Sequence, residues 1–326
     1  MLIRKLLQRL TLGALACATT LTAVAASAAP AADWPRRPVT MIVPYAPGGG
    51  TDIVARLIAQ KLSLQWKQPV VVENRPGANG VIGTSHVAKA EPDGYTMMMV
   101  VGSHALNPIL LKSLPYDTAK DFTPITRLAI SPMVLVVAQD NPGKDLKALV
   151  EAARGKQMGV GYSEGTTQLT GELFRQEGNL KTTPVPYKGG AQIMVDIMGG
   201  HLEMGFTSVL TALPHVTGGK LRVIGVAADE RMDIFPQAMT FKEAGLGGVQ
   251  SLNWYGLFGP KGMPADVVAR INADLRTATD DPAVAKQMKD QGAQVVLTPP
   301  AEFDAFMREE QAKWSKVAER GGIKPQ

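Results

Sequence analysis

The residue types best suited to chemistry gather in glycine-rich loops, the first of which runs from Pro44 to Asp52 between an apolar run and a helical pattern. Its three consecutive glycines, Gly48 to Gly50, let the backbone turn tightly and approach a ligand closely. The start of the following helix offers unpaired N–H groups and the positive end of a helix dipole, which favour an anion. The sequence therefore predicts an anion site, while a plain loop whose helix is capped by Thr51 or Asp52 stays equally open.

Two later loops, Gly161–Gln168 and Tyr187–Gln192, also join a strand to a helix. Loops at the carboxyl ends of strands in two facing lobes would line one cleft. Helix N-termini that point in from both sides suit a small anion with a charge at each end. The first loop lacks the Gly-Lys-Ser/Thr ending of a P-loop, so a nucleoside triphosphate is not the expected ligand.

The second loop also has the Gly-x-Ser-x-Gly spacing of a nucleophile elbow around Ser163. A secreted serine hydrolase that uses Ser163 is therefore an alternative function. The chain has no His-Gly-Gly-Gly oxyanion segment. The candidate acid and histidines of a triad after Ser163 are Asp196, His201 and His215, and none of these histidines lies near the C-terminus. We expect that the protein is not an enzyme and has no catalytic residue.

Metal and cofactor chemistry has no motif in this sequence. The histidines show no i, i+4 pairing and no cysteine companions, and they are His86, His104, His201 and His215. The single cysteine, Cys17, lies in the first segment of the chain. We expect no metal and no cofactor.

Short apolar runs alternate with helical patterns along the chain, which predicts βαβ units with a parallel sheet covered on both faces. The predicted strands are 39–44, 70–72, 95–101, 133–138, 158–162, 183–187, 202–206, 221–227 and 250–258, and the predicted helices are 53–62, 81–90, 146–153, 167–176, 191–198, 210–217, 264–277, 283–291 and 300–319. Because no low-complexity linker separates the halves, we expect ordered strands to cross near Ile130 and Trp254. Domain 1 is then 29–130 with 255–326, domain 2 is 131–254, and a hinged cleft lies between them.

Residues 1–28 read as a signal peptide, with Arg4, Lys5 and Arg9 before an apolar run and Ala26-Ser27-Ala28 as the cleavage site. Their removal from 326 residues leaves 298, and the loss of three positive charges lowers the net charge from +5 to +2. This small charge argues against a nucleic-acid partner. We expect a secreted protein in the periplasm.

Motifs spread over nearly the whole mature chain carry a family resemblance. They are Trp34–Val39, Val43–Asp52, Glu73–Ala78, Pro92–Tyr95, His104–Pro108, Gly171–Phe174, Val185–Gly190 and Gly256–Pro260. With these residues the chain resembles the receptors of tripartite tricarboxylate transporters, the Bug family. The resemblance implies a two-lobed, type II-like Venus-flytrap periplasmic binding protein. It would close on a small carboxylate as a monomer and deliver it to the large and small membrane subunits of the transporter.

The resemblance also implies the ligand contacts by position. They are Tyr45, Ala46, Gly48, Gly49, Thr51 and Asp52 in the first domain, with Asn79, Ser103 and His104 nearby, and Ser163, Thr166, Thr167, Gln168, Tyr187, Gly189, Thr207 and Ser208 in the second. The chain departs from the family at Tyr162–Gln168, a short loop with Gln168 where relatives have histidine, and Glu164 adds a negative charge there. A ligand with a cationic or amide-bearing group that faces Glu164 is therefore an open alternative. A ligand sensor for a membrane signalling kinase would share all these residues and is a second alternative.

Overall fold

The computed structural model describes residues 33–325, and the chain divides into the units Met1–Trp34 and Pro35–Gln326. The predicted signal peptide lies outside the described residues. All that follows concerns the second unit, the part beginning at Pro35. No helix in the described part is long and apolar enough to span a membrane.

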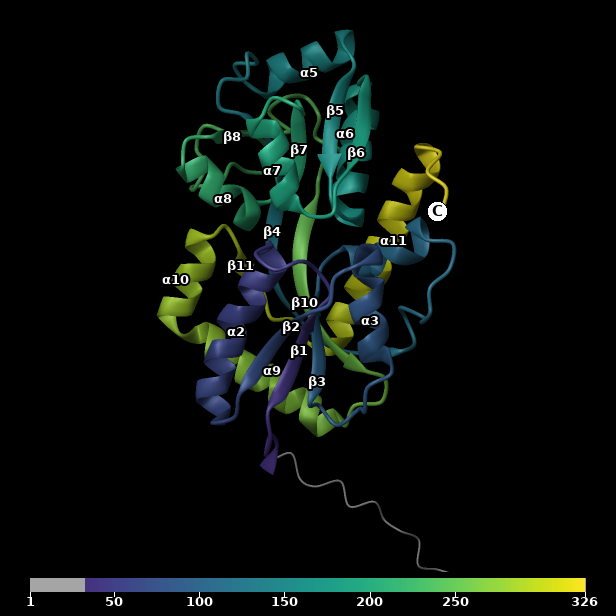
Figure 1. The fold of residues 1–326 in the computed structure, drawn as a ribbon, viewed down its shortest axis with the longest axis vertical. Helices are drawn as coiled ribbons and strands as arrows, with labels where there is room; N and C mark the ends of the chain where they lie inside the picture. The colour runs from purple at the N-terminus through teal and green to yellow at the C-terminus, as the bar shows by residue number, and fades with distance from the viewer. Residues whose placement is uncertain (1–32, 326) are drawn as a thin grey trace, which may run out of the picture. The chain divides into compact units, whose positions relative to one another are not determined.

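The first lobe has a parallel core of three strands with helices packed on it (Figure 1). Its central strand pairs in parallel with one neighbour on each side, in the order β2-β1-β3. The elements are β1 (Val39–Val43), α2 (Gly50–Trp66), β2 (Val70–Asn74), η2 (Ala78–Gly80), α3 (Val81–Ala88), β3 (Thr96–Val100), α4 (Ser103–Leu110), α9 (Ala265–Asp280), α10 (Pro282–Asp290), β11 (Gln294–Val295) and α11 (Pro300–Arg320).

The second lobe repeats the strand-helix alternation. Its elements are α5 (Leu146–Gly155), β5 (Met158–Tyr162), α6 (Gly165–Gly178), β6 (Thr182–Pro186), α7 (Gly190–Met198), β7 (Met204–Ser208), α8 (Val209–Thr217), β8 (Leu221–Val226) and β9 (Met239–Thr240). Here β5 pairs in parallel with β6 and β7, and β8 pairs in parallel with β9.

Two long strands connect these groups: β4 (Phe122–Ala138) and the antiparallel β10 (Leu252–Pro260) (Figure 1). The first part of β4 pairs with β10, and its last six residues, 133–138, pair with β7 and β8 of the second lobe. Ile130 and Trp254, the predicted crossing points, are register partners in the β4–β10 ladder. The domain boundaries themselves stay a prediction.

Side chains of β4 alternate between two cores in the second lobe, as the pleat of a strand requires. Met133, Leu135 and Val137 join the cluster with α5 and α6, whereas Val134 and Val136 join the cluster with α7 and α8. This burial of both faces explains the continuous apolar run in the sequence. A further cluster joins the lobes, since Leu106 and Leu110 of α4, Leu169 and Leu173 of α6, and Trp314 of α11 pack together.

The fold class is confirmed, and three of the local differences bear on the site or on the path of the chain. The sheets are mixed rather than parallel, because β4 leaves the first lobe and β10 returns to it in the opposite direction. The short helix α4 was not predicted, and Pro108 inside it breaks the helical pattern. Strand β7 ends at Ser208, two residues later than predicted.

Candidate functional site

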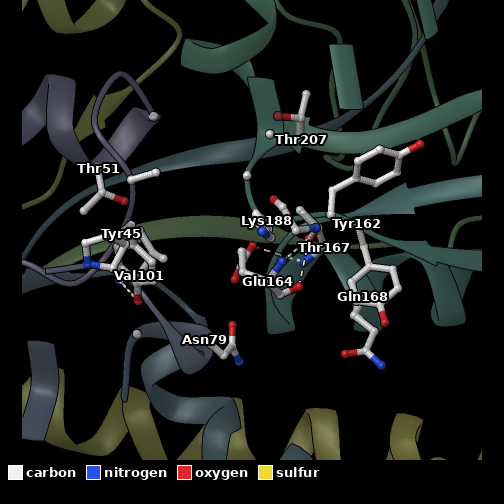
Figure 2. A pocket seen from close by; sticks show the side chains of 18 of the residues that line it. Tyr45, Thr51, Asn79, Val101, Tyr162, Glu164, Thr167, Gln168, Lys188 and Thr207 are labelled. Carbon is white, nitrogen blue, oxygen red and sulfur yellow. Dashed lines mark hydrogen bonds between the residues drawn. The ribbon is translucent and has the colours of Figure 1, made fainter. Parts of the chain in front are cut away.

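A cavity of about 740 Å³ has walls from both lobes, and the starts of four helices, α2, α6, α7 and α8, line it. Figure 2 shows side chains of the two lobes facing each other across it. The first lobe contributes mainly Pro44–Thr51 and Pro76–Gly80, and the second lobe Tyr162–Glu164, Thr167, Gln168, Tyr187–Ala191, Thr207, Ser208 and Thr211. This convergence follows from the placement of the predicted loops at the carboxyl ends of parallel strands.

The first wall is the loop before α2, which begins at Gly50 with Gly49 as an N-cap that offers no side chain. The predicted alternative, in which Thr51 or Asp52 caps the helix, is wrong because both residues lie inside α2. The N–H groups of the first turn therefore have no side-chain cap from the chain itself. Such a helix start favours a negatively charged group.

Asp52 holds this loop in place instead of facing the cavity. Its Oδ2 accepts hydrogen bonds from Gly48 N–H and Arg56 Nε, both at 3.0 Å, and its Oδ1 accepts one from Asn74 Nδ2 at 3.0 Å. Burial works to raise the pKa of Asp52, but the hydrogen bonds from Arg56, Gly48 and Asn74 outweigh it and lower the pKa. Asp52 is therefore an ionised anchor that fixes the approach of Gly48 to the cavity.

Tyr45 and Ser103 form a polar pair on the first lobe, with 2.6 Å between their hydroxyl oxygens. Burial, the largest influence, raises the pKa of Tyr45 far above its ordinary value. Tyr45 is thus a neutral phenol at physiological pH. Its side chain lines the cavity, whereas Ser103 lies behind it.

On the second lobe, Glu164 is the N-cap of α6. Its carboxylate accepts from Thr166 N–H at 3.0 Å and from Thr167 N–H at 3.2 Å. The Thr167 hydroxyl accepts from the N–H groups of Ser163 and Glu164, both at 3.1 Å, which completes a reciprocal capping box. Burial raises the pKa of Glu164, and hydrogen bonds from Thr166, Thr167 and Ser103 oppose the rise.

The third loop brings α7 to the cavity. Gly189 is its N-cap and provides no side-chain cap. The neighbouring Tyr187 lines the cavity and donates its hydroxyl to Asp196 at 2.7 Å, and burial raises the pKa of Tyr187 to about 12. This hydrogen bond fixes the ring beside the start of α7.

The structure brings most of the predicted contact residues together. Those that line the cavity are Tyr45, Ala46, Gly48, Gly49, Thr51, Asn79, Ser163, Thr167, Gln168, Tyr187, Gly189, Thr207 and Ser208. Those that do not line it are Asp52, Ser103, His104 and Thr166. Asp52 and Ser103 instead hold residues that do line the cavity. Asp52 accepts a hydrogen bond from Gly48 N–H, and the Ser103 hydroxyl is hydrogen-bonded to the Tyr45 hydroxyl. Thr166 is fully buried beneath the start of α6.

His104 lies in the first-lobe core rather than at the cavity. Its ring packs 5.1 Å from both Phe122 and Phe258, measured between ring centroids, and is 1% exposed. Burial lowers the pKa of His104 to about 3, so the imidazole is neutral. In the described part of the chain neither ring nitrogen has a hydrogen-bond partner.

Replacing His104 by leucine is therefore expected to leave the free energy of unfolding unchanged or raise it by about 1 kcal/mol, because two unsatisfied buried polar atoms are removed. Urea unfolding measures this. We also expect ligand affinity to stay within about twofold of the wild-type value. A loss of affinity at full stability would restore the contact role that the resemblance gives to His104.

The hydrolase alternative has little support in this geometry. Ser163 lines the cavity, but no histidine among residues 33–325 does so. Asp196 is bonded to Tyr187. A serine nucleophile needs an adjacent base, and among the described residues the Ser163 hydroxyl has no hydrogen bond to a basic side chain.

Several lining residues were not among the predicted contacts. The charged ones are Glu164, Lys188 and Lys324, and another is Asn253, which is 6% exposed. Glu164 and Lys188 flank predicted contacts and were within reach of sequence reasoning. Asn253 and Lys324 lie far along the chain and carry no local motif. No group of three or more potential ligand side chains within residues 33–325 could hold a metal ion.

Comparisons with known proteins give a family model and several similar solved structures. The family model described as tripartite tricarboxylate transporter family receptor matches residues 54–323. The solved structure of the periplasmic binding protein BugD has a TM-score of 0.84 and 30% identity, covering 90% of this chain and 100% of that one.

Two structures from Rhodopseudomonas palustris were solved with carboxylates. Rpa4515 with adipate has a TM-score of 0.86 and 32% identity, covering 90% of this chain and 100% of that one. MatC with bound malate has a TM-score of 0.80 and 32% identity, covering 87% and 99% of the two chains.

Proposed function

The chain belongs to the tripartite tricarboxylate transporter receptor family, and from this membership we propose that it captures a small carboxylate and delivers it to the membrane subunits of such a transporter. The observation that carries the proposal is a cavity that is lined by the starts of four helices from both lobes. Helix N-termini favour anions without any arginine. The bound adipate and malate of two relatives support a carboxylate as the ligand class.

The location and partners follow from the same proposal. A receptor of this kind works in the periplasm, and the predicted signal peptide 1–28 would export it there. Its partners would be the large and small membrane subunits of the transporter, with the receptor as a monomer, no catalytic step and no nucleic acid.

The mechanism we propose is closure of domain 2 (131–254) on domain 1 (29–130 with 255–326). A ligand that touches both lobes only in the closed form shifts the equilibrium toward that form by its difference in affinity. The Gly165 N–H donates to Asn79 Oδ1 across the lobes at 3.3 Å, and Asn79 lines the cavity, so this bond couples the ligand site to closure.

A thermal-shift panel of mono-, di- and tricarboxylates tests this function. A true ligand at ten times its dissociation constant is expected to add about 1.4 kcal/mol to the free energy of unfolding. Small-angle scattering should then show a smaller radius of gyration with ligand. The absence of a thermal shift from every carboxylate would refute the proposal, as would ester turnover abolished by Ser163→Ala.

A further inference from the structure

The N-terminus of α6 is fully occupied by the chain itself. Gly165 N–H donates to Asn79 Oδ1, while Thr166 N–H and Thr167 N–H each donate to a different oxygen of the Glu164 carboxylate. The next group, Gln168 N–H, donates to the Glu164 carbonyl oxygen at 3.0 Å. A carboxylate of this protein thus takes the place at α6 that a ligand carboxylate would otherwise occupy (Figure 2).

The other helix starts at the cavity differ from α6. The Ser208 side chain caps α8 by accepting from Thr211 N–H, whereas α2 and α7 begin after Gly49 and Gly189, which have no side chain to accept such a bond. Lys188 directly precedes Gly189 and also lines the cavity. The helix starts of α2 and α7, which have no side-chain cap, and the nearby Lys188 therefore suit a ligand carboxylate. This place lies away from the capped start of α6.

Glu164 faces the cavity as an unneutralised acceptor. No cation is among the groups that influence Glu164, and the lysines that line the cavity within the described residues, Lys188 and Lys324, are exposed. Each carboxylate oxygen of Glu164 accepts a backbone N–H, and these two hydrogen bonds favour the ionised form against the effect of burial. A second ligand carboxylate placed here would meet like charge, whereas an ammonium or amide N–H would gain a charge-assisted hydrogen bond.

We propose that Glu164 makes this receptor selective for a monocarboxylate whose far end donates hydrogen bonds, an ammonium or a primary amide, over the dicarboxylate of the same length. The inference rests on the proposed function, because it assumes that the cavity takes a carboxylate. It differs from that function in naming which end of the ligand meets which lobe. Glu164 is then the residue that determines specificity.

Titration calorimetry with matched ligands tests the selectivity on the full mature receptor. Succinate, glutarate and adipate are each compared with their monoamide and with the ω-amino acid of similar backbone length. We expect at least one monoamide or amino acid to bind ten times more tightly than its dicarboxylate. Equal or tighter binding of every dicarboxylate overturns the inference and leaves the proposed function standing. Binding by no member also overturns the inference, and the wider carboxylate panel then decides the proposed function.

Two variants test the role of Glu164. Glu164→Gln removes the charge and keeps one acceptor, and Glu164→Ser replaces the cap by a residue preferred at that position. We expect each to lower the preference for the donor-bearing ligand at least tenfold and to improve dicarboxylate binding. Asp145→Asn, which removes the charge of the N-cap of α5 outside the cavity, is the matched control and should keep the wild-type ratio. An unchanged ratio in a folded Glu164 variant refutes the assignment.

Discussion

Replacing Gly50 by valine is expected to weaken ligand binding roughly 30- to 150-fold, equivalent to about 2–3 kcal/mol. A Cβ at Gly50 would lie 2.8 Å from the Tyr255 hydroxyl and 2.9 Å from the Ser208 hydroxyl. Tyr255 is fully buried on β10, and Ser208 caps α8, so neither side chain is free to move aside. The start of α2 would then be displaced from the second lobe, and with it the N–H groups that face the cavity.

Calorimetry with the tightest carboxylate of the panel measures the loss, and urea unfolding shows whether the fold survives. Gly49→Ala is the matched control, because its Cβ would meet only the Ala46 carbonyl oxygen, at an ordinary 3.7 Å. Its φ of −78° also suits alanine. Wild-type affinity in Gly50→Val would show that the close approach of the lobes at this point does not serve binding.

Much of the fold was predictable because its signals are local. The helix over Gly50–Trp66 repeats apolar residues at helical spacing, and Val54, Leu57, Ile58 and Leu62 are buried as that spacing requires. Glycine-rich loops after apolar runs predicted where the cavity lies. The family resemblance is likewise confirmed, since the family model matches residues 54–323.

The missed elements depend on contacts between distant segments. The first part of β4 contains Pro124 and Pro132, which argue against a strand, yet its pairing with β10 makes the strand continuous from Phe122 to Ala138. Asn253 and Lys324 reach the cavity only through the return of the chain along β10 and α11. No local pattern could have predicted either residue.

The role of Glu164 was missed for a different reason. Capping boxes have Ser or Thr at the N-cap and Glu at the third position, and here Glu164 and Thr167 exchange these places. The sequence therefore indicated only that Glu164 adds a negative charge beside an anion site. The structure shows that this charge satisfies the helix start, which changes what ligand group that lobe can accept.

Asp52→Asn is expected to lower the free energy of unfolding by about 2 kcal/mol at pH 7, because a buried, charge-assisted cluster is broken. The Asp52 side chain is 6% exposed, but Arg56 is 53% exposed, so the full value of a buried ion pair does not apply. The folded-state pKa is lowered, so the stabilisation is complete above the ordinary carboxyl pKa and disappears as the pH falls through the lowered value. The difference between wild type and variant should therefore shrink in acid.

Urea unfolding from pH 7 down to pH 3 measures this profile. Asp304→Asn is the matched control, since Asp304 pairs with Arg308 at the same i, i+4 spacing but both side chains are exposed, and we expect less than about 0.5 kcal/mol there. Because Asp52 holds Gly48 at the cavity wall, the Asp52 variant should also bind the ligand more weakly while Asp304→Asn does not. Equal stability of the two variants at pH 7 would show that the loop before α2 keeps its shape without the carboxylate.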